Sequence, residues 1–345
     1  MTAIGSILLL IATAMIAGRT ARGAPTPSGS APLTRIVVVH DPRAQDAYVP
    51  RPDLVRRMMD RAVIRWTGAP DLAAAWRSLV ATGDVVGIKV HSVPGPIFGT
   101  RPAVVEALVR GLIESGVPPT NIVVWDKYLR DLEKAGFDDL ARRHGVELAG
   151  AADAGYDPAV FYESPLLGTL VWGDLEYGQH QPGAGRKSHV TLLLTRRITR
   201  LIVVSPMMAH PEAGVTGLLY TLARGSVDNF QRFEGESARL ARAVPEICAL
   251  PPLADHLALC VVDGLLCQYL GGNRGLLHYS SELNEIRVGR DPVALDVLSL
   301  REIERQRRIL GIAHPPVSRE LYDNAALLEL GISDPTRIEV ITLND

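Results

Sequence analysis

Three histidines and one lysine have the clearest potential for chemistry in this chain. Lys89 and His91 end one apolar run, His210 follows another, and His180 lies in a glycine-rich stretch. If the two runs form neighbouring parallel strands, these side chains meet at the carboxyl edge of a sheet, where open α/β folds bind ligands. Three imidazoles gathered there would bind a divalent transition metal and leave a coordination position for water. Hydrogen-bonded loop histidines, acid–base catalysis and anion binding are the alternatives.

No HxH or HExxH motif fixes such a metal site locally, and the candidate oxygen ligands are also scattered along the chain. These candidates are Asp126, Asp228 and Asp263. The three cysteines form no CxxC pattern, so no iron–sulfur cluster is expected. Cys260 lies in an apolar run and is expected to be a core residue.

Lys89 ends an otherwise apolar segment, 84–90. A desolvated lysine has a lowered pKa and can act as a base or nucleophile. It can equally hold an anion or pair with a carboxylate such as Asp126, and we favour this pairing. The loop from Gly95 to Thr100 then leads into a helix N-terminus, whose unpaired N–H groups suit a phosphate or carboxylate. The loop matches neither GxGxxG nor a P-loop.

The stretch 198–229 is the one around which the chain is organised. Its apolar, β-branched run at 201–204 predicts a buried strand that breaks at Ser205-Pro206. A glycine-containing turn and a helix follow, and Tyr220 on that helix could reach the same pocket as the histidines. A strand that leads through a polar loop into a helix is typical of a ligand site in an α/β sheet.

Loops around this pocket supply the other expected ligand contacts. Asp228-Asn229 could bind a ligand or cap the next segment. The glycine-rich stretch 177–187 could form a second anion cradle, a mobile lid or a solvated loop. The expected ligand-binding residues are Gly95, Thr100, Asp126, Lys187, Thr216, Asp228 and Asn229.

Alternating strands and helices must position these residues. Beside the central stretch, strands are expected at 35–39, 84–90, 121–126, 145–148, 257–263, 286–288 and 337–343, and ordered structure is expected to resume at 189–195. Helices are expected at 51–66, 71–80, 101–115, 129–143, 292–310 and 320–330. This order predicts an α/β fold with a mostly parallel sheet flanked by helices. Residues 150–188 show no period and predict a long irregular insertion.

Composition excludes several classes of function. The chain has 345 residues, of which 47% are hydrophobic and 21% charged, as in ordinary globular proteins. The net charge of −2 and the aromatic content of 5% speak against a nucleic-acid partner. A small anionic molecule is the expected partner.

The N-terminus predicts export to the periplasm or the cell exterior. The 15 residues from Ile4 to Gly18 are apolar or small, which is too short for a comfortable membrane span. We therefore expect a signal peptide at 1–23, a linker at 24–34 and a single α/β domain at 35–345. The alternatives are an uncleaved anchor, which would be the chain's only stable membrane segment, and a misassigned start codon.

Five segments in order resemble the family called domain of unknown function 362: VGIKVHSVPG, RPAVVEALVRGLIESGV, NIVVWDK, AGVTGLLYTLARGSVDN and VGRDPVALDVLSL. The resemblance covers residue 36 to the C-terminus and implies one α/β domain, in a family whose members are often exported. Some relatives carry ferredoxin-type cysteines, which are absent here. Many have a lysine where this chain has Met208 and a Lys-Asn pair where it has Tyr220-Thr221. The resemblance therefore implies a divergent branch and no particular activity.

These observations lead to three functional hypotheses. The first is an enzyme acting on a small anionic substrate, with Lys89, His91, His210 and Tyr220 as catalytic residues and His91, His180 and His210 as metal ligands. In this hypothesis Lys89 and Lys187 hold the anion. The second is a non-catalytic ligand-binding protein of the cell envelope, and the third is a structural protein.

Overall fold

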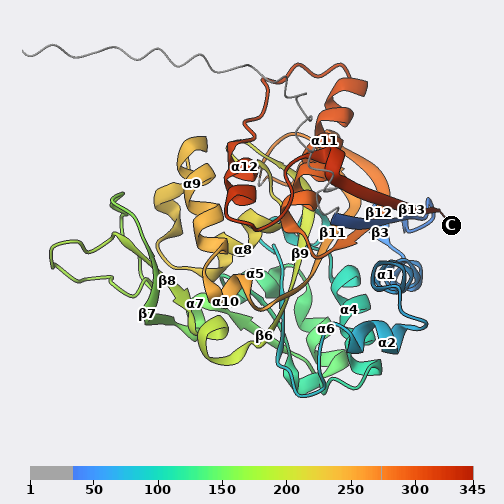
Figure 1. Ribbon diagram of the computed structural model, residues 1–345, viewed down its shortest axis with the longest axis horizontal. Coiled ribbons are helices and arrows are strands. Elements are labelled where there is room, and N and C mark those ends of the chain that lie inside the picture. Colours follow the sequence, from blue (N-terminus) through green and yellow to red (C-terminus); the bar gives the residue numbers. More distant parts are fainter. Residues whose placement is uncertain (1–33, 273, 345) are drawn as a thin grey trace, which may run out of the picture. The chain divides into compact units, whose positions relative to one another are not determined.

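The expected α/β architecture is confirmed by the computed structural model, which describes residues 34–272 and 274–344 (Figure 1). The predicted signal peptide, and the linker up to residue 33, lie outside the described residues. Nine strands of the described chain join one sheet, in the order β13-β1-β12-β11-β9-β4-β5-β6, with β10 paired to β9. Among the described residues, no helix has the length and apolar character needed to cross a membrane.

The sheet is mostly parallel, as predicted. β12 is antiparallel to both of its neighbours, whereas β13, β1, β11, β9, β4, β5 and β6 all run in one direction. The short β10 is antiparallel to β9. The strands are β1 (Thr34–His40), β4 (Val86–Lys89), β5 (Ile122–Asp126), β6 (Glu147–Gly150), β9 (Arg200–His210), β10 (Gly214–Val215), β11 (Leu257–Gln268), β12 (Ser280–Gly289) and β13 (Ile338–Asn344).

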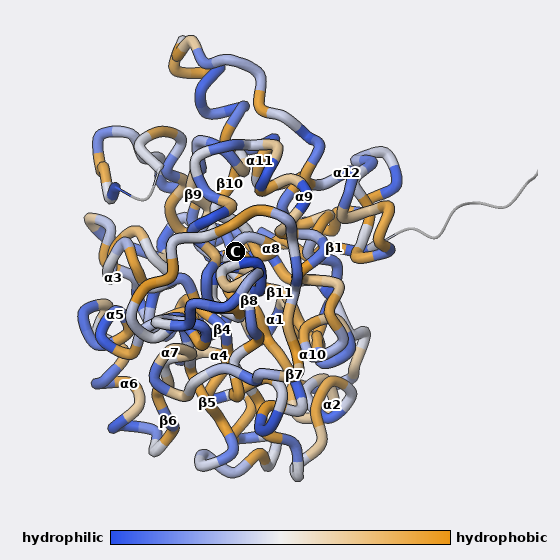
Figure 2. Tube along the Cα trace, turned by 90° about the vertical axis from the view of Figure 1, so that its left-hand side faces the viewer, coloured by the Kyte–Doolittle hydropathy of each residue, from blue (hydrophilic) through white to orange (hydrophobic). Residues whose placement is uncertain are grey.

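Helices cover both faces of the sheet because its central strands are apolar on both sides. In β5, Val124 faces one core cluster and Val123 the other. One face packs against α1 (Pro52–Thr67), α2 (Leu72–Arg77), α4 (Pro102–Glu114), α5 (Leu129–Lys134) and α6 (Phe137–His144). The other packs against α8 (Leu218–Ser226), α9 (Ser237–Cys248), α10 (Pro251–Ala254), α11 (Pro292–Ile309) and α12 (Glu320–Leu327). Figure 2 shows the hydrophobic stretches along the central strands.

Local signals explain several helix boundaries. The side chain of Asp291 accepts a hydrogen bond from the Ala294 N–H at 2.8 Å, which is the N-cap that begins α11. The helix predicted at 129–143 is instead two helices, α5 and α6. Gly136 separates them with a φ of +83°, a conformation that glycine adopts readily.

The predicted break at Ser205-Pro206 is wrong, because β9 continues to His210. Proline lacks the N–H that a central strand normally donates, which made a break the natural expectation. Pro206 is tolerated because it lies beyond Val203, the last residue of β9 that pairs with β4. On the other side, the register with β11 shifts immediately after Pro206.

The insertion at 150–188 is only partly irregular. It contains α7 (Ala151–Ala154) and β7 (Tyr156–Glu163), and β7 pairs with β8 (Lys187–Thr191) to form a hairpin outside the main sheet. A register shift within β7 explains why no period is visible in its sequence. The irregular part is the connection at 164–186, which we call the hairpin loop. Other short elements include β2 (Gln45–Asp46), β3 (Val49–Pro50) and α3 (Gly95–Phe98).

Candidate functional site

The carboxyl ends of the central strands bring together polar side chains from distant parts of the sequence. β4 and β5 are parallel neighbours, and so are β4 and β9. Lys89 therefore ends β4 beside Asp126 at the end of β5, while His91 follows β4 and His210 ends the longer β9. This edge of the sheet is where a site was expected.

Lys89 forms a buried ion pair with Asp126, as favoured from the sequence. Its ammonium lies 2.8 Å from Asp126 Oδ1 and donates to the Val90 carbonyl at 2.6 Å. Burial lowers the pKa of Lys89, and the nearby Asp126 only partly opposes this effect. Gly225 makes room for the lysine, because a Cβ there would lie 1.9 Å from Lys89 Cε.

Asp126 is saturated by protein donors. Besides Lys89 it accepts hydrogen bonds from the N–H and hydroxyl of Ser92 and from the N–H of Lys127. Burial raises the pKa of Asp126, but the neighbouring charges, chiefly that of Lys89, and the hydrogen bonds from Lys89 and Ser92 together outweigh burial, so the pKa is well below its usual value. Asp126 and Lys89 therefore satisfy each other and offer little to a ligand.

His91 and His210 converge on the ring of Tyr220. The ring centroids lie 6.4 Å apart for His91 and Tyr220, and 4.4 Å apart for His210 and Tyr220. Burial lowers the pKa of His91 to about 3. Burial, followed by the charge of Arg224, lowers that of His210 to about 4. Both imidazoles are therefore neutral at pH 7.

The two imidazoles differ in how their nitrogens are used. His210 Nδ1 accepts the N–H groups of Glu212 and Ala213, at 3.2 and 3.1 Å. His91 Nε2 is buried and has no hydrogen-bond partner among the described residues. The main-chain N–H of His91 is held by the hydroxyl of Thr100, which itself donates to the Val204 carbonyl.

Tyr220 links this histidine pair to a neighbouring pocket. Its hydroxyl donates to Glu234 Oε1 at 2.9 Å, and the same oxygen lies 3.6 Å from Arg224 Nε. Arg224 Nη1 is buried, with no hydrogen-bond partner in the part of the chain that the structure describes. Arg224 is therefore a cation whose donors are only partly used.

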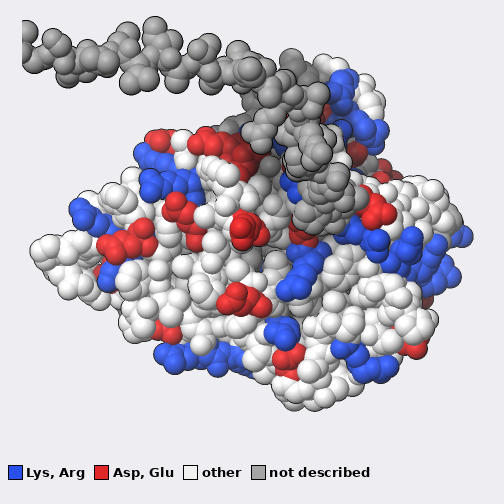
Figure 3. Space-filling model, viewed as in Figure 1, with Lys and Arg blue, Asp and Glu red and all other residues white. Residues whose placement is uncertain are grey.

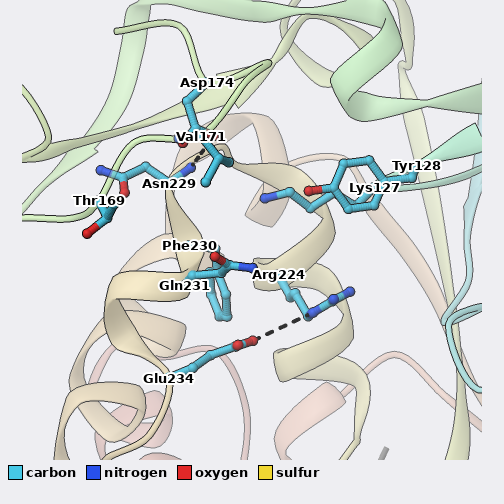
Figure 4. Close-up of a pocket in the computed structure, with 10 residues that line it drawn as sticks. All are labelled: Lys127, Tyr128, Thr169, Val171, Asp174, Arg224, Asn229, Phe230, Gln231 and Glu234. Carbon is cyan, nitrogen blue, oxygen red and sulfur yellow. Dashed lines mark hydrogen bonds and ion pairs between the residues drawn. The ribbon is translucent and has the colours of Figure 1, made fainter. Parts of the chain in front are cut away.

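Figure 4 shows this pocket at the carboxyl edge of the sheet. Lys127 and Tyr128 enter from the end of β5, Arg224 from α8, and a third group from the hairpin loop. The lining residues are Lys127, Tyr128, Thr169, Val171, Asp174, Arg224, Asn229, Phe230, Gln231 and Glu234. The cavity offers about 40 Å³ to the centre of a water-sized group, enough for a few waters or a small ion.

Charge in the pocket is unevenly used. Lys127 is buried and donates to the Val227 carbonyl at 2.9 Å, and no described carboxylate lies within ion-pair distance of its ammonium. Burial, and then the charge of Arg224, lowers the pKa of Lys127 to about 8. By contrast, Asp174 accepts the N–H groups of Val171 and Asn229. The carboxylate of Asp174 is therefore hydrogen-bonded within the protein, whereas Lys127 and Arg224 keep N–H donors available for a ligand.

Sequence reasoning missed Lys127, Tyr128, Arg224 and Glu234. Lys127 had a signal, because it directly follows the apolar strand that ends in Asp126. Arg224 had none, since a basic residue in the last turn of a helix is commonplace.

Several predicted ligand contacts have internal partners. Asp228 accepts the N–H groups of Leu175 and His189, and so ties the hairpin loop to the body of the protein. The side-chain amide of Asn229 donates to the carbonyls of Gly185 and Lys187, although Asn229 also lines the pocket.

Lys187 and Thr216 lie elsewhere than expected. The ammonium of Lys187 sits 4.3 Å from the ring centroid of Phe161, on the hairpin, and Lys187 does not line the pocket. Thr216 is buried, and its N–H donates to the Met208 carbonyl at 2.7 Å. Neither residue contacts the histidine pair through any described hydrogen bond.

The predicted anion site, at the loop Gly95 to Thr100 and the helix N-terminus that follows it, is occupied by a carboxylate of the same chain. The N–H of Arg101 before α4 donates to Asp263 Oδ2 at 3.0 Å, and the Arg101 guanidinium pairs with the same carboxylate. Gly95 itself turns the chain with a φ of +81°. The carboxylate that this helix N-terminus was expected to attract is therefore Asp263 of the same chain.

The structure does not gather the three histidines into a metal-ligand group. His180 is exposed in the hairpin loop, away from the buried His91 and His210. Among the described residues, no three or more His, Cys, Asp or Glu side chains lie close enough together to hold a metal ion. The three cysteines are buried free thiols, and Cys260 is a core residue as expected.

The fold and the site define an α/β protein with a small cationic pocket at the carboxyl edge of a mostly parallel sheet. No protein-family model and no curated protein matches the chain. Among solved structures, a Thermotoga maritima protein from a structural genomics programme is similar over 76% of this chain, with 12% identity and a TM-score of 0.41. The chain spans 59% of the length of that protein.

Proposed function

We propose that the protein binds a small anionic molecule in the pocket lined by Lys127, Tyr128 and Arg224. The observation that carries this proposal is the buried Arg224 Nη1, which has no hydrogen-bond partner among the described residues. A buried donor without a partner is costly, so a ligand oxygen at this position would recover that free energy. Guanidinium groups suit carboxylates and phosphates because they present several donors in one plane.

Lys127 supports the same ligand class. Its ammonium is held by a main-chain carbonyl and is not neutralised by a contacting carboxylate of the described chain. With Arg224 it places two positive charges on one small cavity. A group of the size of a phosphate or a carboxylate matches this space better than a nucleotide does.

We further propose that any chemistry is acid–base in kind and uses Lys127, rather than Lys89. A lysine with a pKa of about 8 can exchange protons near neutral pH, whereas Lys89 is committed to Asp126. Tyr220 and Glu234 form the hydrogen bond that connects the pocket to the neutral His210. A binding protein without turnover is the second candidate, since the partly used donors of Arg224 support binding equally well.

A titration tests the binding proposal. Isothermal titration calorimetry of the full chain with inorganic phosphate, sulfate, acetate and citrate should detect at least one ligand. Arg224→Gln should weaken that binding at least tenfold, because a charge-assisted hydrogen bond is lost. The matched control is Arg242→Gln, which removes an exposed arginine from α9. Failure of all four anions to bind, or equal binding by Arg224→Gln, would refute the proposal.

We also propose a family and a location for this protein. We propose that the chain is a divergent member of the domain of unknown function 362 family. Two of the five resembling segments supply pocket residues, Lys127 in NIVVWDK and Arg224 in AGVTGLLYTLARGSVDN. Export is supported by the apolar residues Ile4 to Gly18.

A further inference from the structure

The hairpin loop exposes large apolar side chains to an unusual degree. Trp172 is 88% exposed, Leu167 60% and Tyr177 50%, and Val171 and Leu175 are also exposed. The rings of Trp172 and Tyr177 meet edge to face, with centroids 5.9 Å apart. Single exposed apolar residues are common on soluble proteins, but five within 11 residues are a concentration that indicates a partner.

The acidic residues of this loop point inward. Asp174 and Glu176 are buried. Asp174 accepts the N–H of Val171, and Glu176 accepts that of Gly185. Asp228 holds the N–H of Leu175 from the body of the protein. These hydrogen bonds fix the backbone with its apolar side chains outward, so the exposure is a built feature of the loop.

The position of the loop suits contact with an extended surface. The β7–β8 hairpin lies outside the main sheet, and its loop extends beyond it at the left of Figure 1. In Figure 3 the end of this loop shows neither basic nor acidic side chains. The large apolar side chains that this loop exposes are Trp, Tyr, Leu and Val. This is the composition of side chains found in the interfacial zone of a bilayer, where amphipathic rings lie at headgroup level.

We propose that the hairpin loop is a membrane-docking surface that inserts Trp172, Leu167 and Tyr177 into the interface of a lipid bilayer. A bilayer is the favoured partner because the two carboxylates within 167–177, Asp174 and Glu176, are buried, so the exposed side chains of this segment carry no charge that would have to be desolvated in the interface. Docking is driven by the burial of apolar side chains and does not use the cations of the proposed anion pocket, although Val171 of the same loop also lines that pocket.

Quenching of tryptophan emission by brominated phosphatidylcholine tests this proposal on the full chain. Of the other three tryptophans, Trp76 and Trp125 are fully buried and Trp66 is partly buried on α1, so bromine atoms in the bilayer reach Trp172 most readily. We expect strong quenching and a blue shift in the wild type, and loss of both in Trp172→Phe. Leu167→Ser should reduce the quenching. This readout reports the loop itself, even if the N-terminal segment also holds the chain on the vesicle.

Two controls separate the outcomes. Leu327→Ser removes an 80% exposed leucine from the end of α12 and should leave quenching unchanged. Arg224→Gln should also leave it unchanged, which distinguishes docking from anion binding. Quenching that persists in Trp172→Phe, or is absent from the wild type, would overturn the proposal. So would self-association in sedimentation velocity that Trp172→Ser abolishes, because the loop would then join two copies of the chain.

Discussion

At the scale of single residues, the two buried lysines of the site differ in what balances their charge. Lys89 is matched by the carboxylate of Asp126, whereas Lys127 is held by the carbonyl of Val227. A carbonyl supplies a dipole and no charge, so only Lys127 retains a full charge for a ligand. The pairing of Lys89 could be predicted because both residues end apolar strands. The role of Lys127 could not, since it depends on the fold around its side chain.

Removing one member of the buried pair should be far more harmful than removing both. Lys89→Met leaves Asp126 buried without its counter-ion, and we expect a loss of about 3–5 kcal/mol in the free energy of unfolding. The double variant Lys89→Met/Asp126→Asn should recover much of this loss. Urea denaturation measures both. Equal destabilisation by the single and double variants would contradict the pairing.

Anion binding should depend on the protonation of Lys127. With a pKa of about 8, the ammonium is charged below that pH and loses its proton above it. Affinity measured by calorimetry should therefore fall as the pH rises through about 8. Lys127→Gln should bind more weakly and lack this dependence. A wild-type affinity that stays constant between pH 7 and 9 would show that Lys127 does not hold the anion.

At the scale of elements, two helices have N-termini that are filled by carboxylates from far along the chain. Asp263 receives the N–H of Arg101 before α4, and Asp296 receives those of Leu218 and Leu219 at the start of α8. A cap such as Asp291, three residues from its partner, is visible in the sequence. Partners 78 and 162 residues away are not. Local signals such as the cap made the types of the elements predictable. The long-range contact of Asp263 was not visible, so the N-terminus of α4 was wrongly predicted to be a ligand site.

The carboxyl of Asp296 should make stability depend on pH. Burial raises its pKa from 3.8 to about 7, so the folded state binds a proton more tightly than the unfolded state does. This contribution to stability is present below about pH 4 and is lost as the pH rises to about 7. The difference in unfolding free energy between the wild type and Asp296→Asn, measured by denaturation from pH 4 to 8, should shrink or reverse accordingly. A constant difference would contradict the raised pKa.

At the scale of the whole described chain, the hairpin loop lies outside the two core clusters of the sheet yet forms one wall of the pocket. Thr169, Val171 and Asp174 come from this loop, and the two cores contain none of the three. The insertion could be predicted because residues 150–188 show neither a helical nor a strand period of apolar residues. That the insertion lines the site could not be predicted, because the contacts that fix it are made to Asp228 and Asn229.

A substitution that disturbs the contact of the hairpin loop with Asn229 should therefore weaken anion binding in the pocket without destabilising the core of the sheet. A Cβ at Gly168 would lie 2.0 Å from Asn229 Oδ1, so Gly168→Ala must push the loop away from Asn229. We expect anion affinity to fall about tenfold and limited proteolysis within 164–186 to accelerate, while the unfolding free energy changes by less than about 1 kcal/mol. Gly83→Ala is the matched control, because nothing lies within 4 Å of its Cβ. If Gly168→Ala binds anions like the wild type despite faster cleavage, the loop is not a wall that the ligand needs, and binding rests on Lys127 and Arg224 alone.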